Sequence, residues 1–508
     1  AVDIPVWQEE NCIQCNRCAY VCPHAVIRPV ALTEEEVAQA PEGLKTLDMI
    51  GMPGMKFTMT VSAYDCTGCG SCVNVCPGKK NKETGEVEKA LTMANMEANA
   101  GEQTFFDFGR EIPVKPEVVA KFKETTVKGS QFKQPLLEFS GACAGCGETP
   151  YAKLITQLFG DRMYIANATG CSSIWGNSSP STPYTVTPEG KGPAWSNSLF
   201  EDNAEFGYGM LLAQNTIRDR LKAKVEKIAE KTTDEAVKAA AAEYLETYTV
   251  GATNGTATDK LVAALEALDC DCEERAEVLK NKDFLAKKSQ WIFGGDGWAY
   301  DIGYGGVDHV LASKKDINIM VFDTEVYSNT GGQSSKATKT GATAQFAAGG
   351  KETKKKDLAG MAMTYGYVYV AQIAMGADFN QTVKAIAEAE AYPGPSLIIA
   401  YAPCINHGIK KGMSKAQTEE QLAVECGYWN NFRYNPAAEG DKFSLDSKAP
   451  KAEGYQDFLN GEVRYNALKR ANPAKADKLF ALNEQEAMER YDYLNKLVTV
   501  YAAEKEDK

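Results

Sequence analysis

Histidine is nearly absent from this sequence, with three residues in 508, and none of them stands in a recognisable arrangement of nucleophile and base. The sequence also lacks an apolar run long enough to cross a membrane, and its start, AVDIPVWQEE, has neither the basic nor the apolar part of a leader. Basic residues are outnumbered by acidic ones, and the net charge of −13 argues against nucleic-acid binding, which depends on Lys and Arg. We therefore expect a cytoplasmic protein that binds neither membrane nor nucleic acid.

Cysteine, in contrast, is abundant, with 15 residues. A disulfide framework is not expected in so long a chain, so the cysteines indicate metal centres and a reducing compartment. The length predicts roughly two to four domains. The hydrophobic content of 44% and the charged content of 24% are typical of a globular protein.

The strongest motif is a cysteine run that occurs twice near the N-terminus, each time followed by proline (Pro23 and Pro77). In bacterial ferredoxins with this spacing, three thiolates hold one cluster and the fourth crosses to the other. The spacing therefore predicts two neighbouring 4Fe-4S clusters, with two zinc sites as the alternative. The predicted ligands are Cys12, Cys15, Cys18 and Cys76 for one cluster, and Cys66, Cys69, Cys72 and Cys22 for the other.

The segments around this repeat carry weaker signals. Residues 28–60 separate the two copies as an insertion with one helix-like run, LTEEEVAQA, and no assigned function. Residues 101–140 contain recurring prolines and indicate a linker that lies over the next domain. Three lysines after the second copy could dock an acidic electron carrier, although a solvated turn is the more usual role of a charge run. They are Lys79, Lys80 and Lys82; a second basic run, residues 351–356, is also interpreted as a solvated turn.

A diphosphate site is predicted where two apolar runs end. The run at 291–293 leads into Gly294-Gly295-Asp296-Gly297, and the run at 317–322 delivers Asp323-Thr324. If both are parallel strands, these residues share the sheet edge where ligands bind, next to helix N-termini that suit phosphates. Asp296 and Thr324 can then supply oxygen ligands to Mg²⁺. A Gly-rich turn without a ligand is the alternative.

Four further cysteines could meet at the same edge. Cys143 and Cys146 form a Gly-flanked CxxC before a predicted helix at 151–159, while Cys171 and Cys404 each follow a predicted strand. Parallel strand ends lie on one edge of a sheet, so the four can converge near Asp296. Buried structural cysteines are the alternative. Cys270, Cys272 and Cys426 have no partner set, and we expect them to be structural.

Together these motifs resemble the C-terminal portion of the pyruvate:ferredoxin (flavodoxin) oxidoreductases, from residue 1 to at least Cys426. Thiamine enzymes generally carry Gly-Asp-Gly followed by Asn-Asn. Here Asp323-Thr324 stand in the second place, as they do in the 2-oxoacid:ferredoxin oxidoreductases. The resemblance implies that Cys143, Cys146, Cys171 and Cys404 bind a third 4Fe-4S cluster, next to thiamine diphosphate.

The resemblance also implies the remaining site residues. The Mg²⁺ ligands would be Asp296, Thr324 and the carbonyl of Val326, and Asn329 would face the reacting carbon as the catalytic residue. Contacts with thiamine diphosphate would come from Glu148, Cys171, Gly295, Asp296, Gly297, Trp298, Thr324, Glu325, Val326, Tyr327, Ser328 and Asn329.

The implied activity is oxidative decarboxylation of pyruvate to acetyl-CoA and CO₂, with electrons passed through three 4Fe-4S clusters to ferredoxin or flavodoxin. The scarcity of histidine fits an enzyme whose cofactor carries the hard chemistry. The aminopyrimidine, pyruvate and coenzyme A sites would lie in a missing N-terminal half or partner chain of a homodimeric enzyme. Two alternatives stay open: another 2-oxoacid such as 2-oxoglutarate or indolepyruvate, or a non-catalytic iron–sulfur electron-transfer subunit.

The predicted fold is α/β, with a small α+β two-cluster ferredoxin-like domain ahead of a thiamine diphosphate-binding domain built on a mostly parallel sheet. Two amphipathic scaffold helices are predicted within 210–248. The predicted units are 1–100 for the ferredoxin-like domain with its insertion, 101–140 for the linker, 141–430 for the thiamine domain, and 431–508 for a helical extension that wraps a neighbouring or partner chain.

Overall fold

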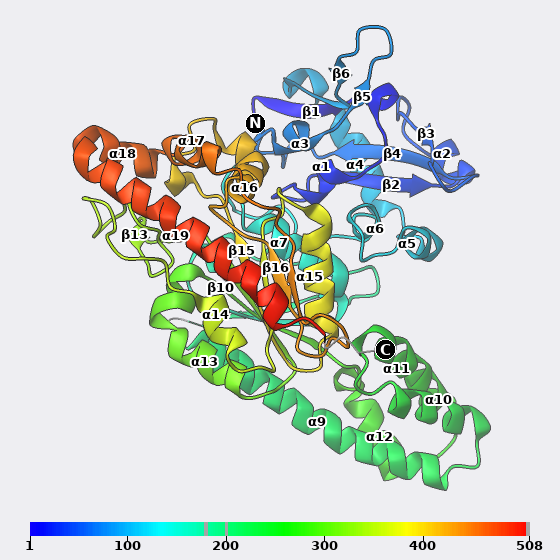
Figure 1. The fold of residues 1–508 in the computed structure, drawn as a ribbon. Coiled ribbons are helices and arrows are strands. Elements are labelled where there is room, and N and C mark those ends of the chain that lie inside the picture. Colours follow the sequence, from blue (N-terminus) through cyan, green and yellow to red (C-terminus); the bar gives the residue numbers. More distant parts are fainter. Residues whose placement is uncertain (177–180, 199–201, 504–508) are drawn as a thin grey trace, which may run out of the picture.

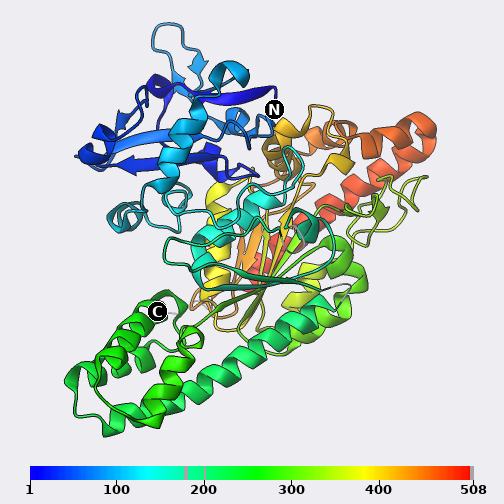
Figure 2. The same cartoon turned by 180° about the vertical axis from the view of Figure 1, so that it is seen from behind.

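A computed structural model describes residues 1–176, 181–198 and 202–503. A small N-terminal domain lies at one end of a central sheet, and a bundle of helices extends from the other end (Figure 1). The reverse view shows the same arrangement (Figure 2). Within the described residues, no helix is both long and apolar enough to span a membrane.

The N-terminal domain is closed by pairing of its two ends. Strand β1 (Asp3–Trp7) pairs antiparallel with β7 (Leu91–Asn95). This pairing brings the two cysteine copies together, and the short helices that follow them, α1 (Arg17–Tyr20) and α3 (Ser71–Val75), pack against each other. The domain therefore has the two-fold arrangement that the repeat predicts.

The insertion between the copies forms a hairpin. Strand β2 (Ile27–Leu32) pairs antiparallel with β4 (Lys56–Val61), and β3 (Leu47–Asp48) adds to β4. The helix-like run is confirmed as α2 (Glu34–Ala38), which starts at a capping box. Phe57 of β4 is fully buried in the core of the domain, so the insertion is part of that core.

Only the last part of the predicted linker lies over the second domain, where Val127 and Leu137 are buried in the core of that domain. Residues 101–140 contain α4 (Glu102–Glu111), α5 (Pro116–Phe122) and α6 (Val127–Ser130). Helix α4 packs on β4, and Val118 and Phe132 are buried in the core of the first domain. Pro116 starts α5, because Pro is compatible with the first helical turn.

The second domain is built on an eight-stranded sheet, which confirms the predicted α/β class. The strands follow the order β17-β16-β14-β15-β11-β10-β8-β9. All pairings from β14 to β9 are parallel, whereas β16 and β17 run antiparallel. The strands are β8 (Met163–Asn167), β9 (Ala194–Asn197), β10 (Ser289–Gly295), β11 (Ile317–Asp323), β14 (Tyr369–Ile373), β15 (Pro395–Tyr401), β16 (Phe432–Tyr434) and β17 (Phe443–Leu445).

Helices cover both faces of this sheet. Alternate residues of β11 point to opposite sides, so Ile319 and Val321 pack on one face and Met320 and Phe322 on the other. The first face is covered by α9 (Asn203–Lys231), α13 (Tyr304–Ala312), α14 (Leu358–Met363) and α19 (Pro473–Val500), and the second by α7 (Thr149–Phe159) and α15 (Phe379–Ala391). Because both faces are buried, the central strands are continuously apolar.

Four helices form a separate bundle beyond the sheet (green in Figure 1). The two scaffold helices predicted within 210–248 are confirmed as α9, which ends at Lys231, and α10 (Glu235–Glu246), which begins after the capping residue Asp234. Helices α11 (Gly251–Ala267) and α12 (Glu273–Lys280) follow. The bundle has its own core. A disulfide joins Cys270 and Cys272 between α11 and α12, which agrees with the structural role expected of them.

The predicted C-terminal extension belongs to the second domain. Strands β16 and β17 complete the sheet, and α17 (Tyr455–Asn460), α18 (Val463–Ala471) and α19 pack on this same chain. Leu479 and Phe480 of α19 are buried against the loop that contains Gly341 and Gly350. The segment up to residue 503 therefore packs on its own chain, and a contact with another chain stays a prediction; residues 504–508 lie outside the described part.

Candidate functional site

The predicted strand ends meet at one edge of the sheet. In the parallel register, Phe293 of β10 is opposite Asn167 of β8, and Gly295 is opposite Phe322 of β11. Asp323 at the end of β11 is in turn opposite Tyr401 at the end of β15. The loops that follow β8, β10, β11 and β15 therefore lie side by side.

Three oxygen groups meet on this edge. Thr324 Oγ1 lies 3.0 Å from Asp296 Oδ1 and 3.0 Å from the carbonyl oxygen of Val326. The backbone N–H of Thr324 also donates to Asp296 Oδ1, at 3.2 Å. All three residues are buried, and a carboxylate, a hydroxyl and a carbonyl are the donors that Mg²⁺ prefers. The group fits a magnesium ion by the type of its atoms and their convergence.

The carboxylate of Asp296 lies in an environment that disfavours its charge. Burial and the neighbouring Asp323 raise the pKa of Asp296 well above its usual range. Ser335 Oγ donates to Asp296 Oδ2 at 2.6 Å, and no basic side chain forms an ion pair with Asp296 in the described residues. A bound cation would stabilise the ionised form, which supports the same assignment.

Glycine is required where the predicted turn leaves β10. A Cβ on Gly297 would lie 2.4 Å from the ring of Tyr327, and one on Gly294 would lie 2.3 Å from the ring of Trp298. The turn continues as a π-helical segment, Gly297–Ile302, a rare conformation that is frequent at functional sites. The tight packing places Trp298 and Tyr327 beside the oxygen cluster.

A small hairpin carries the predicted catalytic residue. Strands β12 (Val326–Tyr327) and β13 (Gln333–Ser334) pair antiparallel, and Asn329 is exposed in the turn between them. Ser328 Oγ lies 3.0 Å from Cys171 Sγ, and Asn406 Nδ2 donates to the Ser328 carbonyl at 3.1 Å. The hairpin therefore joins the loops after β8 and β15.

The third cysteine set also converges at this edge. Burial raises the pKa of Cys146, Cys171 and Cys404, that of Cys404 to about 12, and neighbouring members of the set raise each further. Within the set, Cys143 is the cysteine that raises the pKa of Cys404. Four neighbouring thiols fit a 4Fe-4S cluster by the type and number of their donors.

A glycine brings two of these loops together. The N–H of Gly147 donates to the carbonyl of Pro403 at 3.1 Å, and a Cβ on Gly147 would lie 2.6 Å from the nitrogen of Pro403. Gly147 directly follows Cys146, and Pro403 directly precedes Cys404. The close backbone approach therefore holds the CxxC loop against the loop after β15.

The eight cysteines of the first domain form the two predicted sets. Burial raises the pKa of Cys18, and its charged neighbours are Cys15, Cys12 and Cys76. Burial likewise raises the pKa of Cys72, whose neighbours include Cys22, Cys69 and Cys66. A cavity of about 20 Å³ is lined by all four members of the first set. The fourth cysteine of each run thus lies with the other copy.

In the described residues, no three His, Cys, Asp or Glu side chains stand close enough to share one metal ion. A 4Fe-4S cluster has a different requirement, because each of its four irons binds one thiolate. The three cysteine sets fit clusters by the type and number of their donors.

Glu148 has a partner that the sequence did not reveal. Trp175, at the end of α8 (Cys171–Trp175), donates from Nε1 to Glu148 Oε2 at 2.6 Å. Burial raises the pKa of Glu148 to about 7, although this hydrogen bond lowers it. The carboxyl thus lies next to Cys146 and Cys171 and can exchange a proton near neutral pH.

The side chain of Glu325, a predicted cofactor contact, has protein partners instead. Lys355 Nζ lies 3.0 Å from Glu325 Oε1, Arg464 Nη1 lies 2.9 Å from Oε2, and the Tyr428 hydroxyl also donates to it. Burial opposes ionisation, but the charges of Lys355 and Arg464 outweigh it and hold the pKa of Glu325 far below its usual range. The expectation that residues 351–356 are a solvated turn was therefore wrong for Lys355, which is buried between Glu325 and Asp323.

His407 supports the oxygen cluster from behind. Its Nε2 donates to the carbonyl of Thr324 at 2.7 Å, and the N–H of Cys404 donates to its Nδ1 at 3.5 Å. Burial lowers the pKa of His407 to about 3, so the ring is neutral. A neutral imidazole with Nε2–H satisfies both bonds and fixes Thr324.

Comparison with protein families agrees with this geometry. Residues 11–80 match the 4Fe-4S dicluster domain, and residues 278–400 match the thiamine pyrophosphate enzyme, C-terminal TPP binding domain. The chain thus joins an iron–sulfur dicluster domain to a thiamine diphosphate-binding domain.

Curated relatives match nearly the whole chain. It is 56% identical over 98% of its length to a pyruvate:ferredoxin oxidoreductase of Moorella thermoacetica, and 53% identical over 98% to a pyruvate-flavodoxin oxidoreductase of Enterobacter agglomerans. It covers 42% of each of these proteins, and 26% of a pyruvate dehydrogenase [NADP(+)] of Euglena gracilis that is 47% identical. The chain is therefore homologous to a portion of the pyruvate:ferredoxin and pyruvate-flavodoxin oxidoreductases.

A solved 2-oxoglutarate:ferredoxin oxidoreductase from Magnetococcus marinus is a weaker match. It covers 53% of this chain with a TM-score of 0.30 and 16% identity. A likeness of this strength does not bear on the choice of 2-oxoacid.

Proposed function

We propose that this chain is the electron-transfer and diphosphate-binding portion of an enzyme that converts pyruvate to acetyl-CoA and CO₂ and reduces ferredoxin or flavodoxin. The observation that carries the proposal is the convergence of the third cysteine set and the Asp296 oxygen cluster on one sheet edge. This convergence supports an electron donor and an electron acceptor within the same group of loops.

The residues would hold the cofactors as follows. Asp296, Thr324 and the Val326 carbonyl would bind Mg²⁺, which neutralises the diphosphate. Thiamine diphosphate would supply the carbanion chemistry needed to cleave a 2-oxoacid, and 4Fe-4S clusters would supply one-electron acceptors. The three ligand sets, by number in this chain, are Cys12, Cys15, Cys18 and Cys76; Cys66, Cys69, Cys72 and Cys22; and Cys143, Cys146, Cys171 and Cys404.

Asn329 is suited to hold the substrate. It is exposed at the tip of the β12–β13 hairpin, where its side-chain amide can donate to a 2-oxoacid oxygen. The preceding residue, Ser328, contacts Cys171. The hairpin thus links the place where substrate would react to the nearest cluster ligand.

Helix α7 provides the route between the domains. It begins just after the Cys143-x-x-Cys146 loop, and the ammonium of Lys153 donates to the carbonyls of Ala19 and Tyr20 in the first domain. These carbonyls lie between two ligands of the paired clusters, Cys18 and Cys22. The helix fixes the third cluster site against the paired sites, so electrons can leave through the first domain.

The rest of the longer protein would complete the site. Because the chain spans about two fifths of its relatives, we assign the aminopyrimidine, pyruvate and coenzyme A sites to the remainder. We further propose a cytoplasmic homodimer, since thiolate-bound clusters persist in a reducing compartment.

Anaerobic reconstitution tests this function. The chain is combined with the missing portion of a close relative, and ferredoxin reduction is followed with pyruvate, 2-oxoglutarate or indolepyruvate as the substrate. Reduction that depends on pyruvate and coenzyme A supports the proposal. Full cluster content without thiamine diphosphate binding would favour a non-catalytic electron-transfer subunit, and turnover with another 2-oxoacid alone would reassign the substrate.

A further inference from the structure

We propose that Arg464, near the C-terminus, is a positioning residue for the magnesium–diphosphate site. It acts through Glu325, whose two chain neighbours are Thr324, which contacts Asp296, and Val326, whose carbonyl accepts from the Thr324 hydroxyl. The inference rests on the cofactor site of the proposed function. It adds a residue of α18 that lies outside the strand-end loops which form the site.

Arg464 lies fully inside a network of charges. Its side chain is 3% exposed, and its Nη1 lies 2.9 Å from Glu325 Oε2. Its Nε lies 2.6 Å from Glu462 Oε2, and its Nη2 donates to the Tyr428 hydroxyl at 3.1 Å. A guanidinium can meet all three groups because its donors form a planar fork, which an ammonium cannot reproduce.

The backbone of Glu325 explains why its side chain must be held. Glu325 has a φ of +60°, the left-handed region that residues with a Cβ rarely adopt. This turn of the chain directs the Thr324 hydroxyl and the Val326 carbonyl toward each other. A buried ion pair on the side chain can hold a backbone that would otherwise relax to negative φ.

The charges around Glu325 also support a positioning role for Arg464. Lys355 is shared between Glu325 Oε1 and Asp323 Oδ2, at 3.0 and 2.7 Å. Without Arg464, a buried carboxylate would lose one of two ion-pair partners and would draw Lys355 away from Asp323. Asp323 directly precedes Thr324 and Glu325 directly follows it, so the loss of Arg464 would disturb both neighbours of Thr324.

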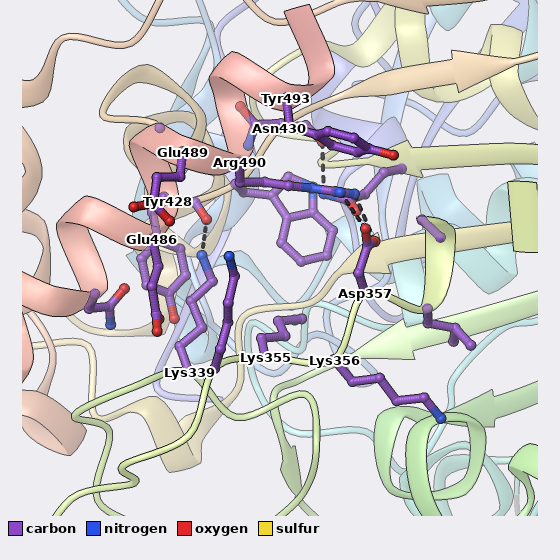
Figure 3. Close-up of a pocket in the computed structure, with 18 of the residues that line it drawn as sticks. Lys339, Lys355, Lys356, Asp357, Tyr428, Asn430, Glu486, Glu489, Arg490 and Tyr493 are labelled. Carbon is purple, nitrogen blue, oxygen red and sulfur yellow. Dashed lines mark hydrogen bonds and ion pairs between the residues drawn. The ribbon is translucent and has the colours of Figure 1, made fainter. Parts of the chain in front are cut away.

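Space beside Lys355 allows this rearrangement. Lys355 and Tyr428 line a cavity of about 260 Å³, together with Arg490 of α19 (Figure 3). Figure 3 also shows Lys339 bonded to the carbonyl of Tyr428 across the cavity. The cavity borders Lys355 and Tyr428, two of the three partners of Glu325, so Lys355 has room to move on that side.

A second contact links the same helix to Thr324. Glu462, which binds Arg464, has Oε1 3.8 Å from Nδ1 of His407, and His407 donates to the Thr324 carbonyl. The backbone N–H of Val463 also donates to the carbonyl of Gly408, at 2.9 Å. The start of α18 therefore contacts the loop after β15, whose His407 holds the Thr324 carbonyl.

The test measures cofactor binding in the complete enzyme that contains this chain. We compare wild type, R464Q, R464K and the double variant R464Q/E325Q, and titrate thiamine diphosphate and Mg²⁺ by calorimetry. We expect R464Q to weaken thiamine diphosphate binding by about 10- to 100-fold, the range typical of partners that orient metal ligands. R464K should lose less affinity for thiamine diphosphate than R464Q does. Adding E325Q to R464Q should recover part of the lost affinity.

Arg490→Gln is the matched control. Arg490 pairs with Asp357 and lines the same cavity, but it does not contact Glu325, so its loss should leave cofactor binding unchanged. Unfolding temperature and iron content are measured for every variant. A folded R464Q with wild-type affinity would overturn the inference, and so would equal losses of stability and binding in R464Q and R464K without recovery by E325Q.

The role of Arg464 can be tested separately from the proposed reaction. If wild type binds Mg²⁺ and thiamine diphosphate but does not oxidise pyruvate, the proposed reaction fails and the role of Arg464 can still be measured. If wild type binds no thiamine diphosphate, both are overturned.

Discussion

The two domains build cluster sites in different ways. In the first domain, three ligands of each set lie within a short loop, and only the fourth comes from the other copy of the repeat. In the second domain, the four cysteines extend from Cys143 to Cys404 and meet only because parallel strands end together.

A local site, whose ligands come mostly from one short loop, depends on the conformation of that loop. An assembled site, whose ligands are distant in sequence, depends on the sheet that brings them together. A local site needs its own turn and one partner segment. The assembled site needs the register of β8, β10, β11 and β15, the backbone contact of Gly147 with Pro403, and the hairpin with Ser328. Changes in the second domain should therefore affect cofactor and third cluster while leaving the paired clusters intact.

The strongest test of this separation is Asp296→Ala. Removing the central magnesium ligand should weaken thiamine diphosphate binding by more than about 100-fold, since even partners of metal ligands cost 10- to 100-fold. Cofactor binding is measured by calorimetry, and the paired clusters by electron paramagnetic resonance. Asp308→Ala, which removes a carboxylate bonded to Tyr365, serves as the control. Loss of the paired-cluster signals in D296A would contradict the separation.

Replacement of a single cysteine ligand should affect the clusters of its own domain only. Cys404→Ser should remove the third cluster, about four irons per chain, and leave both paired clusters. Cys18→Ser should damage the paired clusters and leave thiamine diphosphate binding unchanged. Iron analysis and electron paramagnetic resonance of the reduced protein distinguish these results. Cys426→Ser controls for thiol loss, because Cys426 is buried against the carbonyl of Ala423. Equal iron loss in C404S and C426S would be inconsistent with the assigned ligands.

A smaller change should act on the assembled site through its backbone. In Gly147→Ala the new methyl group would meet Pro403, so the CxxC loop must move away from the loop with Cys404. We expect partial occupancy of the third cluster, roughly half or less, because this backbone contact joins two of its ligand loops. Gly101→Ala, where nothing lies within 4 Å of the added Cβ, should change nothing. Full occupancy in G147A would show that the loops close without this contact.

The smallest expected effect is on stability of the second domain. Burial raises the pKa of Glu420 to about 8, and the carboxyl binds the N–H of Gly376 and the hydroxyl of Tyr151. The folded state therefore keeps a proton that the unfolded state releases, so this stabilisation is full in acid and is lost as pH rises toward 8.

Glu420→Gln should remove that dependence. Between about pH 5 and about pH 8 we expect the unfolding temperature of wild type to fall by several degrees more than that of E420Q. Differential scanning calorimetry at a series of pH values measures the difference, and the signals of the paired clusters should not change. Parallel curves for the two proteins would rule out a protonated Glu420.

Much of this arrangement is predictable from the sequence. The strands at 289–295, 317–323 and 395–401 are mostly apolar because helices cover both faces, and polar or cysteine residues follow within a few positions. The crossing of Cys22 and Cys76 follows from the spacing of the repeat alone. These features depend on neighbours in the sequence or on a single rule of sheet geometry.

The ion pairs that surround Glu325 cannot be predicted from neighbouring residues or from sheet geometry. Lys355 belongs to a run of lysines that is indistinguishable from a solvated turn, and it is buried because Asp323 and Glu325 lie beside it. Arg464 meets Glu325 from a helix far along the chain. Strand β16 has three residues, too few to show an alternating pattern. In each case the environment is created by residues distant in sequence.

The antiparallel strands at the C-terminal side have a consequence for the isolated protein. Strand β14 is paired on one side by β15 and on the other by β16, and four of its five residues are buried. A chain cut before Phe432 would expose the N–H and C=O groups of an apolar strand, a template on which other molecules can add. Such a truncation should form intermolecular β-structure and aggregate even with every proposed cofactor ligand present.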